Sequence, residues 1–166
     1  MPSRAAFTLV EVVLTVLIVG VGLVACLRAI PVLLDASEAS EKSLTAQRLA
    51  TDLLNEIALL PFEDPKDPVK FGPEDDETGD TRAGFDDVDD YDEWSASPPQ
   101  TKDGTKLADA YSRSVLVQSV EPDDFDAACA DDRYKPKRIT VTVSAPGMPD
   151  LSISTIRLRG ANREDR

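Results

Sequence analysis

An almost uncharged apolar segment near the N-terminus constrains this chain more than any other feature. Between Phe7 and Leu27 the only charged side chain is that of Glu11, and Arg28 ends the run. About 20 apolar residues are enough for an α-helix to cross the hydrocarbon core of a bilayer. We therefore expect a transmembrane helix over residues 7–30.

Glu11 is an unusual residue for such a helix. An ionised carboxylate at bilayer depth costs about 2.5–3.5 kcal/mol even on lenient insertion scales, and such residues are usually functional and paired with a cation. The nearest candidate partner in the sequence is the amine that would form if the chain were cut just before Phe7, four residues upstream. We therefore interpret Glu11 as a contact residue and not as a stray polar side chain.

The segment Ala6-Phe7-Thr8-Leu9-Val10-Glu11, preceded by Arg4, resembles the start of the type IV pilin-like family. The resemblance covers about the first 60 residues, and the family usually has Gly where this chain has Ala6. It implies a leader peptide over residues 1–6. In this family a prepilin peptidase cuts at the position between Ala6 and Phe7 and methylates the new N-terminal Phe7. The acid that matches Glu11 then meets the N-terminal ammonium of a neighbouring subunit.

The same resemblance implies where the protein is and what it contacts. The expected location is the inner (cytoplasmic) membrane, with a single pass and a small domain in the periplasm or outside the cell. The implied partners are other pilin or pseudopilin subunits, prepilin peptidase, the inner-membrane assembly platform and membrane lipid. The Val-Glu-Val-Val start, the Val-Gly-Val-Gly-Leu stretch and Leu-Leu-Asn-Glu-Ile are most similar to minor pseudopilin I of type II secretion and to minor pilin V of type IV pili.

Residues 31–60 are expected to continue the helix as an amphipathic segment. Pro31 predicts a kink, because proline removes a backbone donor and crowds the preceding turn. Beyond it, apolar residues recur at spacings of three and four, which places them on one face of a helix, and Pro61 is expected to end it. The residues of this apolar stripe are Ala46, Leu49, Leu53, Ile57 and Leu60.

Residues 61–106 are rich in Pro, Gly, Asp and Glu and have no sustained periodicity, which indicates a long loop. Phe85, Tyr91 and Trp94 lie close together within it, and three aromatic residues in ten predict that part of this loop folds back on the helix.

Residues 107–166 contain three strand-like runs, at 111–120, 138–144 and 151–158, and a turn-rich segment joins the last two. An antiparallel sheet with one face on the amphipathic helix is the simplest arrangement. The fold class predicted from the sequence is therefore α+β, with a long N-terminal helix on a small antiparallel sheet.

Composition excludes several classes of function. The chain has no His, so catalytic triads that need an imidazole and zinc sites with His ligands are excluded. With no nucleophile motif or phosphate-binding loop either, we expect no enzyme activity. The net charge is −13, and residues 61–100 are the most acidic part, which argues against nucleic acid as a partner.

An acidic cluster within the loop raises the question of a bound metal. Flexible loops with many carboxylates can supply the six to eight oxygen ligands that Ca²⁺ takes, and some pseudopilins bind calcium. The irregular spacing and the missing Gly exclude an EF-hand, so we expect a solvated acidic loop and keep Ca²⁺ as the alternative, with no other cofactor. The candidate ligands are Asp86, Asp87, Asp89, Asp90 and Asp92, with Glu93 beside them.

A second interpretation of the N-terminal segment stays open. Leu23-Val24-Ala25-Cys26 fits a bacterial lipobox, in which a signal peptidase cuts before Cys26 and the cysteine carries lipid. The chain would then be a lipoprotein with a periplasmic binding domain. This alternative leaves Glu11 unexplained, and an apolar helical segment follows Cys26 where a polar tether is expected.

Overall fold

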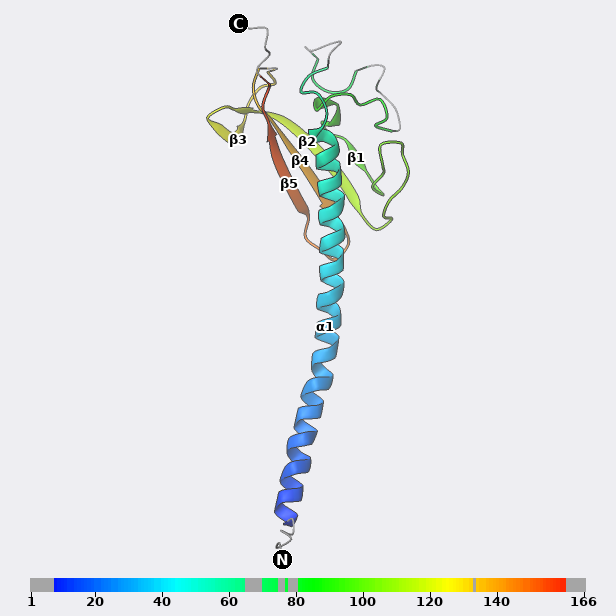
Figure 1. The fold of residues 1–166 in the computed structure, drawn as a ribbon, viewed down its shortest axis with the longest axis vertical. Helices are drawn as coiled ribbons and strands as arrows, with labels where there is room; N and C mark the ends of the chain where they lie inside the picture. The colour runs from blue at the N-terminus through cyan, green and yellow to red at the C-terminus, as the bar shows by residue number, and fades with distance from the viewer. Residues whose placement is uncertain (1–7, 65–69, 75–76, 78–80, 133, 161–166) are drawn as a thin grey trace, which may run out of the picture. The chain divides into compact units, whose positions relative to one another are not determined.

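The computed structural model describes residues 8–64, 70–74, 77, 81–132 and 134–160. The chain divides into two compact units, residues 1–41 and residues 42–166. Helix α1 (Leu9–Ala58) contributes residues to both units (Figure 1). The predicted cleavage site between Ala6 and Phe7 lies outside the described residues.

In the first unit, the stretch of α1 from Leu9 to Leu27 is apolar on all sides apart from Glu11 and Thr15, and its side chains are exposed. Leu9, Val16, Val24 and other large apolar residues of this stretch are more than half exposed. This is the one described helix that is long and apolar enough to cross a membrane, by length and composition. Pro31 lies inside the helix and does not end it, because the helix continues to Ala58.

In the second unit, the last part of α1 buries the apolar stripe predicted from the sequence. Four of its five residues are buried, Leu60 is partly buried just beyond the helix end, and Ala50 joins them. The spacing of three and four residues places these side chains on one face, where they pack on the sheet. The buried residues of the helix are Ala46, Leu49, Ala50, Leu53 and Ile57.

The sheet is antiparallel and has five strands in the order β1-β2-β4-β5, with β3 paired to β2. Short strand β1 pairs with the start of β2, and β3 pairs with its end, where a bulge lies between Val120 and Glu121. The strands are β1 (Ser95–Ala96), β2 (Ser112–Glu121), β3 (Asp124–Ala128), β4 (Lys137–Ser144) and β5 (Leu151–Arg157).

Side chains along β2 and β4 alternate between the two faces of the sheet, and those on one face form the core between the sheet and the helix. Val115 and Val117 on β2 and Ile139, Val141 and Val143 on β4 are all buried, because every second side chain of a strand points to the same face. The α+β class and the three predicted strand regions are confirmed. The sequence did not predict β1, β3 or the 3₁₀ helix η1 (Asp89–Tyr91).

Candidate functional site

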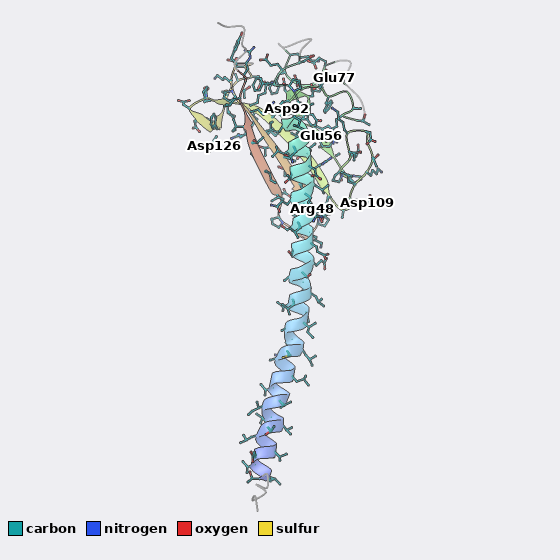
Figure 2. The ribbon with its side chains drawn as sticks, in the orientation of Figure 1. Arg48, Glu56, Glu77, Asp92, Asp109 and Asp126 are labelled. Atoms are coloured by element: carbon teal, nitrogen blue, oxygen red, sulfur yellow. The ribbon has the colours of Figure 1, made fainter. Side chains whose placement is uncertain are left out.

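The N-terminal part of α1 carries the first candidate site. Thr8 Oγ1 accepts a hydrogen bond from the backbone N–H of Glu11 (3.3 Å), and Thr15 Oγ1 donates to the Glu11 carbonyl oxygen (2.7 Å). Side chains project all round this stretch in Figure 2. The Glu11 side chain is exposed, and no described residue forms an ion pair with it. Any cation that pairs with this carboxylate would therefore come from outside the described part of the chain.

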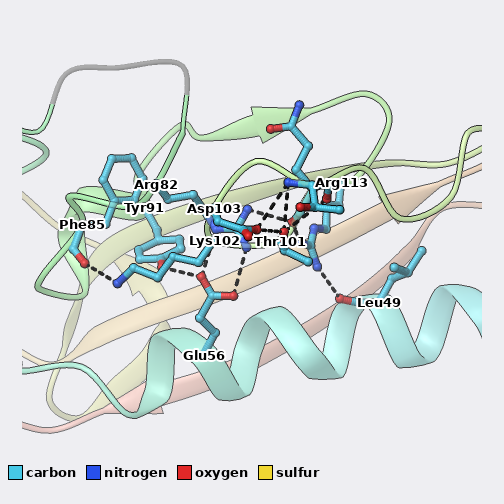
Figure 3. A network of polar contacts seen from close by, with 11 residues as sticks. Leu49, Glu56, Arg82, Phe85, Tyr91, Thr101, Lys102, Asp103 and Arg113 are labelled. Carbon is cyan, nitrogen blue, oxygen red and sulfur yellow. Dashed lines mark hydrogen bonds and ion pairs between the residues drawn. The ribbon is translucent and has the colours of Figure 1, made fainter.

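The acidic loop contacts the part of α1 that belongs to the second unit, and the main polar contact is made to the carboxylate of Glu56 on the helix. Both oxygens of Glu56 are bound by Arg82, with Nε–Oε1 at 3.0 Å and Nη2–Oε2 at 2.9 Å, and the Tyr91 hydroxyl donates to Oε1 at 2.8 Å (Figure 3). Arg82 is buried, and a planar guanidinium matches a carboxylate in this two-bonded way. The prediction that aromatic residues anchor the loop on the helix is confirmed, because Phe85 and Tyr91 are buried and their rings meet edge to face.

These contacts determine the ionisation of Glu56. Burial by itself would raise the pKa of this carboxyl, but the hydrogen bonds from Arg82 and Tyr91 and the charges of Arg82 and Arg113 outweigh it and lower the pKa below its usual value. Burial and the same carboxylate raise the pKa of Tyr91, which keeps the phenol protonated as a donor.

A second buried arginine ties β2 to both the helix and the loop. Arg113 donates to the carbonyl oxygen of Leu49 on α1 (3.2 Å) and to that of Gln100, which also accepts from Arg82 (2.9 Å). Both guanidinium groups lie over the ring of Trp94, at 4.5 Å for Arg82 and 5.8 Å for Arg113. Burial, followed by the charge of Arg82, lowers the pKa of Arg113 to about 10. This network of hydrogen bonds and ring contacts holds the loop, the helix and the sheet together.

The acidic cluster predicted to be a solvated loop is buried, so that expectation is wrong. Asp87, Asp89 and Asp90 are each no more than 3% exposed, Asp86 and Asp92 are half-buried, and only Glu93 is exposed. The segment turns through η1 and its Val88 side chain joins the core, and this folding takes the carboxylates out of water. A buried carboxylate is stable only with hydrogen-bond donors or a cation as partners. The partners of each acid therefore show whether it has a structural role.

Asp87 and Asp90 bind backbone amides of their own turn. Asp87 Oδ1 accepts from the N–H of Asp89 (2.8 Å) and of Asp90 (3.2 Å), and Asp90 Oδ2 accepts from the N–H of Asp86 (2.8 Å) and of Asp87 (2.9 Å). Burial, followed by repulsion from Asp89 and Asp90, raises the pKa of Asp87 to about 8. Burial is also the main cause that raises the pKa of Asp90 to about 6.

Asp89 and Asp92 are engaged with the sheet. Asp89 forms a buried ion pair with Lys137, the first residue of β4, and Lys137 also donates to the carbonyl oxygen of Phe62 (2.8 Å). Asp92 Oδ1 accepts from the backbone N–H of Val117 at 2.9 Å, which satisfies a donor of β2. These two carboxylates have structural partners. The sequence did not identify Lys137 as one of them.

A different set of three acids comes together in the structure. One oxygen each of Glu74, Glu77 and Asp90 lie within 4.8 Å of one another, and this is the one such group of three potential metal ligands among the described residues. The set shares only Asp90 with the predicted calcium ligands. The sequence could not reveal it, because Glu74 and Glu77 are separated from Asp90 by a loop without periodicity.

Comparison with models of known protein families, with curated proteins and with solved structures gives no match. The function is therefore inferred from this chain's own residues.

Proposed function

We propose that this chain is a pilin-like structural subunit, namely a minor pseudopilin of a type II secretion system or a minor pilin of a type IV pilus. It has no enzyme activity. It is cut between Ala6 and Phe7 and methylated on Phe7 by prepilin peptidase, waits in the inner membrane, and joins a filament through its N-terminal helix. Its small domain is exported to the periplasm or the cell exterior.

The observation that carries this proposal is the exposed apolar helix with one acid near its start. A soluble domain of this size gains nothing from a helix whose Leu, Val and Ile side chains face outward on all sides, whereas lipid or the packed core of a filament would cover them. Glu11 has no ion-pair partner in the described part of the chain. The N-terminal ammonium of a neighbouring subunit would supply that charge, and methylation of the amine would retain it.

The lipoprotein alternative gains no support from the helix. Cys26 lies inside α1, which continues without interruption to Ala58. Cleavage before Cys26 would begin the mature protein in the middle of this helix, without a polar tether. Intact mass distinguishes the two proposals, because a mature chain that begins with methylated Phe7 supports the pilin-like proposal and one that begins with lipidated Cys26 overturns it.

Assembly is tested with Glu11→Gln in the native host. The variant is expected to insert in the membrane and to be processed normally, but to be missing from sheared filaments or from crosslinks to neighbouring subunits. Asp35→Asn is a matched control, since Asp35 is an exposed acid on the same helix. Normal incorporation of Glu11→Gln would contradict the assembly role. Loss of incorporation in both variants would also contradict the specific role of Glu11, because removal of any negative charge from the helix would then have the same effect.

A further inference from the structure

Strand β5 lies at one edge of the sheet, with β4 on one side and no described strand on the other (Figure 1). All seven of its residues, Leu151–Arg157, pair with β4 in one continuous register without a bulge. Proteins usually protect such an edge with proline, charged side chains, a bulge or a very short strand. Along β5 there is no Pro or Gly, and the only charged residue is Arg157 at its end. The backbone of β5 is therefore free to pair with a further strand.

The register shows which backbone groups of β5 face outward. The N–H of Val120 donates to the carbonyl oxygen of Pro136, which lies opposite it, at 2.9 Å, so the even-numbered residues of β2 and β4 bond to each other. Because hydrogen-bonded pairs alternate in an antiparallel ladder, the odd-numbered residues of β4 and β5 bond to each other. The N–H and C=O groups of Ser152, Ser154 and Ile156 therefore point to the free edge. No described residue bonds to them there.

The opposite edge of the sheet, along β2, is closed. The N–H of Val115 donates to the carbonyl oxygen of Trp94 (2.8 Å), and the N–H of Val117 donates to Asp92 Oδ1 (2.9 Å). Strands β1 and β3 pair with the two ends of β2. The described part of the chain therefore protects one edge of its sheet and leaves the other open, which indicates that the edge formed by β5 receives a partner.

The apolar face of the sheet is incompletely covered at β5. Ile139, Val141 and Val143 of β4 are fully buried, whereas Leu151 and Ile153 of β5 are only partly buried in the same cluster. A further strand would cover these two side chains if it carried apolar residues at every second position, because residues directly opposite each other point to the same face. An alternating apolar pattern is therefore the first requirement on the occupant.

Charges at the two ends of β5 favour one direction for the added strand. Arg157 donates from Nη2 to the carbonyl oxygen of Leu60 at 2.8 Å, and no described residue forms an ion pair with it. Asp150, just before β5, is an exposed acid. An antiparallel strand with an acid near its N-terminal end and a base near its C-terminal end would bring opposite charges together at both places. Antiparallel pairing also matches the rest of the sheet.

We propose that the edge of β5 binds an extended segment of another protein, which adds to the sheet as an antiparallel strand of about seven residues. The segment has apolar residues at alternate positions, an acid opposite Arg157 and a base opposite Asp150. Its main chain bonds to the outward groups of Ser152, Ser154 and Ile156, as in other cases of strand addition. The inference does not rest on the proposed filament role, because it concerns only the sheet of the folded domain.

A second copy of β5 fits this edge less well than such a segment. Antiparallel self-pairing centred on Ser154 would place the charge of Arg157 opposite the apolar Leu151 in both halves of the pair. Each copy also has a net charge of −13, so two copies repel one another. Light scattering after size-exclusion chromatography measures the oligomeric state, and a dimer that Ser154→Pro converts to a monomer would overturn the proposal in favour of a second copy.

The probe for this edge is the end-blocked peptide Glu-Thr-Val-Thr-Val-Thr-Val-Lys, which has the required charges and apolar pattern. It is titrated into the full-length chain in detergent micelles, and hydrogen exchange of single amides is followed by NMR. Bound peptide is expected to slow the exchange of the Ser152, Ser154 and Ile156 amides by about tenfold or more. No added protection of these three amides at millimolar peptide would overturn the proposal.

A second peptide, with Lys first and Glu last, tests the direction of the added strand. It has the same composition and the same apolar pattern, but in the antiparallel arrangement it would place like charges next to Arg157 and Asp150. Its Kd is expected to be about threefold higher or more, because like charges opposite each other destabilise a strand pair. Equal binding of the two peptides would overturn the assigned direction.

The variants Ser154→Pro and Ser154→Ala form a matched pair. Both remove the hydroxyl that contacts Thr140 Oγ1 at 2.9 Å, but only proline removes the outward N–H, and neither removes a hydrogen bond to β4. Ser154→Pro is expected to raise the Kd of the first peptide about tenfold or more, and Ser154→Ala to change it by less than about twofold. Equal binding by the two variants would overturn the proposal. Ser152→Pro and Ser152→Ala, at the next outward position, replace this pair if Ser154→Pro fails to fold.

Discussion

Lys137 donates a charged hydrogen bond to Asp89, and both side chains are almost completely buried. The ammonium also binds the Phe62 carbonyl oxygen and lies over the rings of Phe62 and Phe71. Asp89 Oδ2 accepts from the backbone N–H of Gly72 at 3.4 Å. A single ion pair therefore connects β4 with η1 and with the segment that follows the helix.

Lys137→Met is expected to destabilise the domain by about 3–5 kcal/mol, because it leaves the Asp89 carboxylate buried without its cation. The double variant Lys137→Met/Asp89→Asn is expected to recover part of this loss, since it removes the uncompensated charge. Urea denaturation of the full-length chain, followed by the fluorescence of Trp94, the single tryptophan, measures both.

Lys135→Met is the matched control for this experiment. Lys135 lies two residues away and pairs with Glu121 at 2.8 Å, but both side chains of that pair are partly exposed to solvent. Pairs near the surface contribute little, so the control is expected to have nearly the stability of the unmodified chain. If Lys137→Met were as mild as Lys135→Met, the buried pair would have no special role in holding the loop.

Periodicity made the helix and three strands predictable. The apolar spacing from Ala46 to Ile57 and the alternation through Ile139, Val141 and Val143 each leave one buried face, and the structure buries these residues. Strands β1 and β3 are two and five residues long, and their pairing depends on neighbours that are distant in sequence. Such short elements have no sequence pattern of their own.

The buried polar residues were harder to predict, although the alternation contained a signal for two of them. Lys137 lies two residues before Ile139, and Arg113 lies two residues before Val115, so each is on the buried face of its strand. The acids are different, because their burial depends on how an aperiodic loop folds. Composition predicted that the acids of this loop are exposed to solvent, whereas the aromatic residues predicted only that part of the loop folds back on the helix.

Glu56→Gln is expected to lower the free energy of unfolding by about 1–3 kcal/mol near neutral pH, because it weakens charge-assisted hydrogen bonds from Arg82. The folded-state pKa of Glu56 is lower than its unfolded value. Its contribution is therefore fully present above the unfolded pKa of about 4.5 and is lost as the pH falls through the lower folded pKa. The stability difference between the two proteins should shrink over that acidic range.

Urea denaturation at a series of pH values between neutral and acidic measures this dependence. Asp52→Asn is the control, since Asp52 is an exposed acid one turn earlier on the same helix. Its stability is expected to follow that of the unmodified chain at every pH. A constant difference between Glu56→Gln and the unmodified chain down to the most acidic values would contradict the assigned role of ionised Glu56.

Leu53→Ala is expected to destabilise the domain by about 2–5 kcal/mol, because Leu53 is fully buried between the helix and the sheet and its removal leaves a cavity. Leu44→Ala, on the same helix, is the control, since Leu44 is 52% exposed. Thermal unfolding monitored by circular dichroism compares the two variants. A larger effect at Leu44 than at Leu53 would show that the core packs on a different face of the helix.

Gly104→Ala tests a close approach between two parts of the loop. Gly104 has a φ of +88°, and a Cβ there would lie 2.8 Å from Thr81 Cγ2. Gly72 has a similar φ of +85° but no atom within 4 Å of an added Cβ. Gly72→Ala is therefore expected to cost only the left-handed backbone term of about 1–2 kcal/mol, whereas Gly104→Ala adds steric overlap of about 1–3 kcal/mol.

The Cγ2 methyl of Thr81 is the atom responsible for that extra cost, so its removal should recover it. In the background Thr81→Ser, which keeps the hydroxyl and lacks the methyl, Gly104→Ala is expected to cost no more than Gly72→Ala does in the unmodified chain. Urea denaturation of the four proteins of this cycle measures the coupling between residues 81 and 104. If Gly104→Ala cost as much in the Thr81→Ser background as in the unmodified chain, the strain would come from the backbone alone.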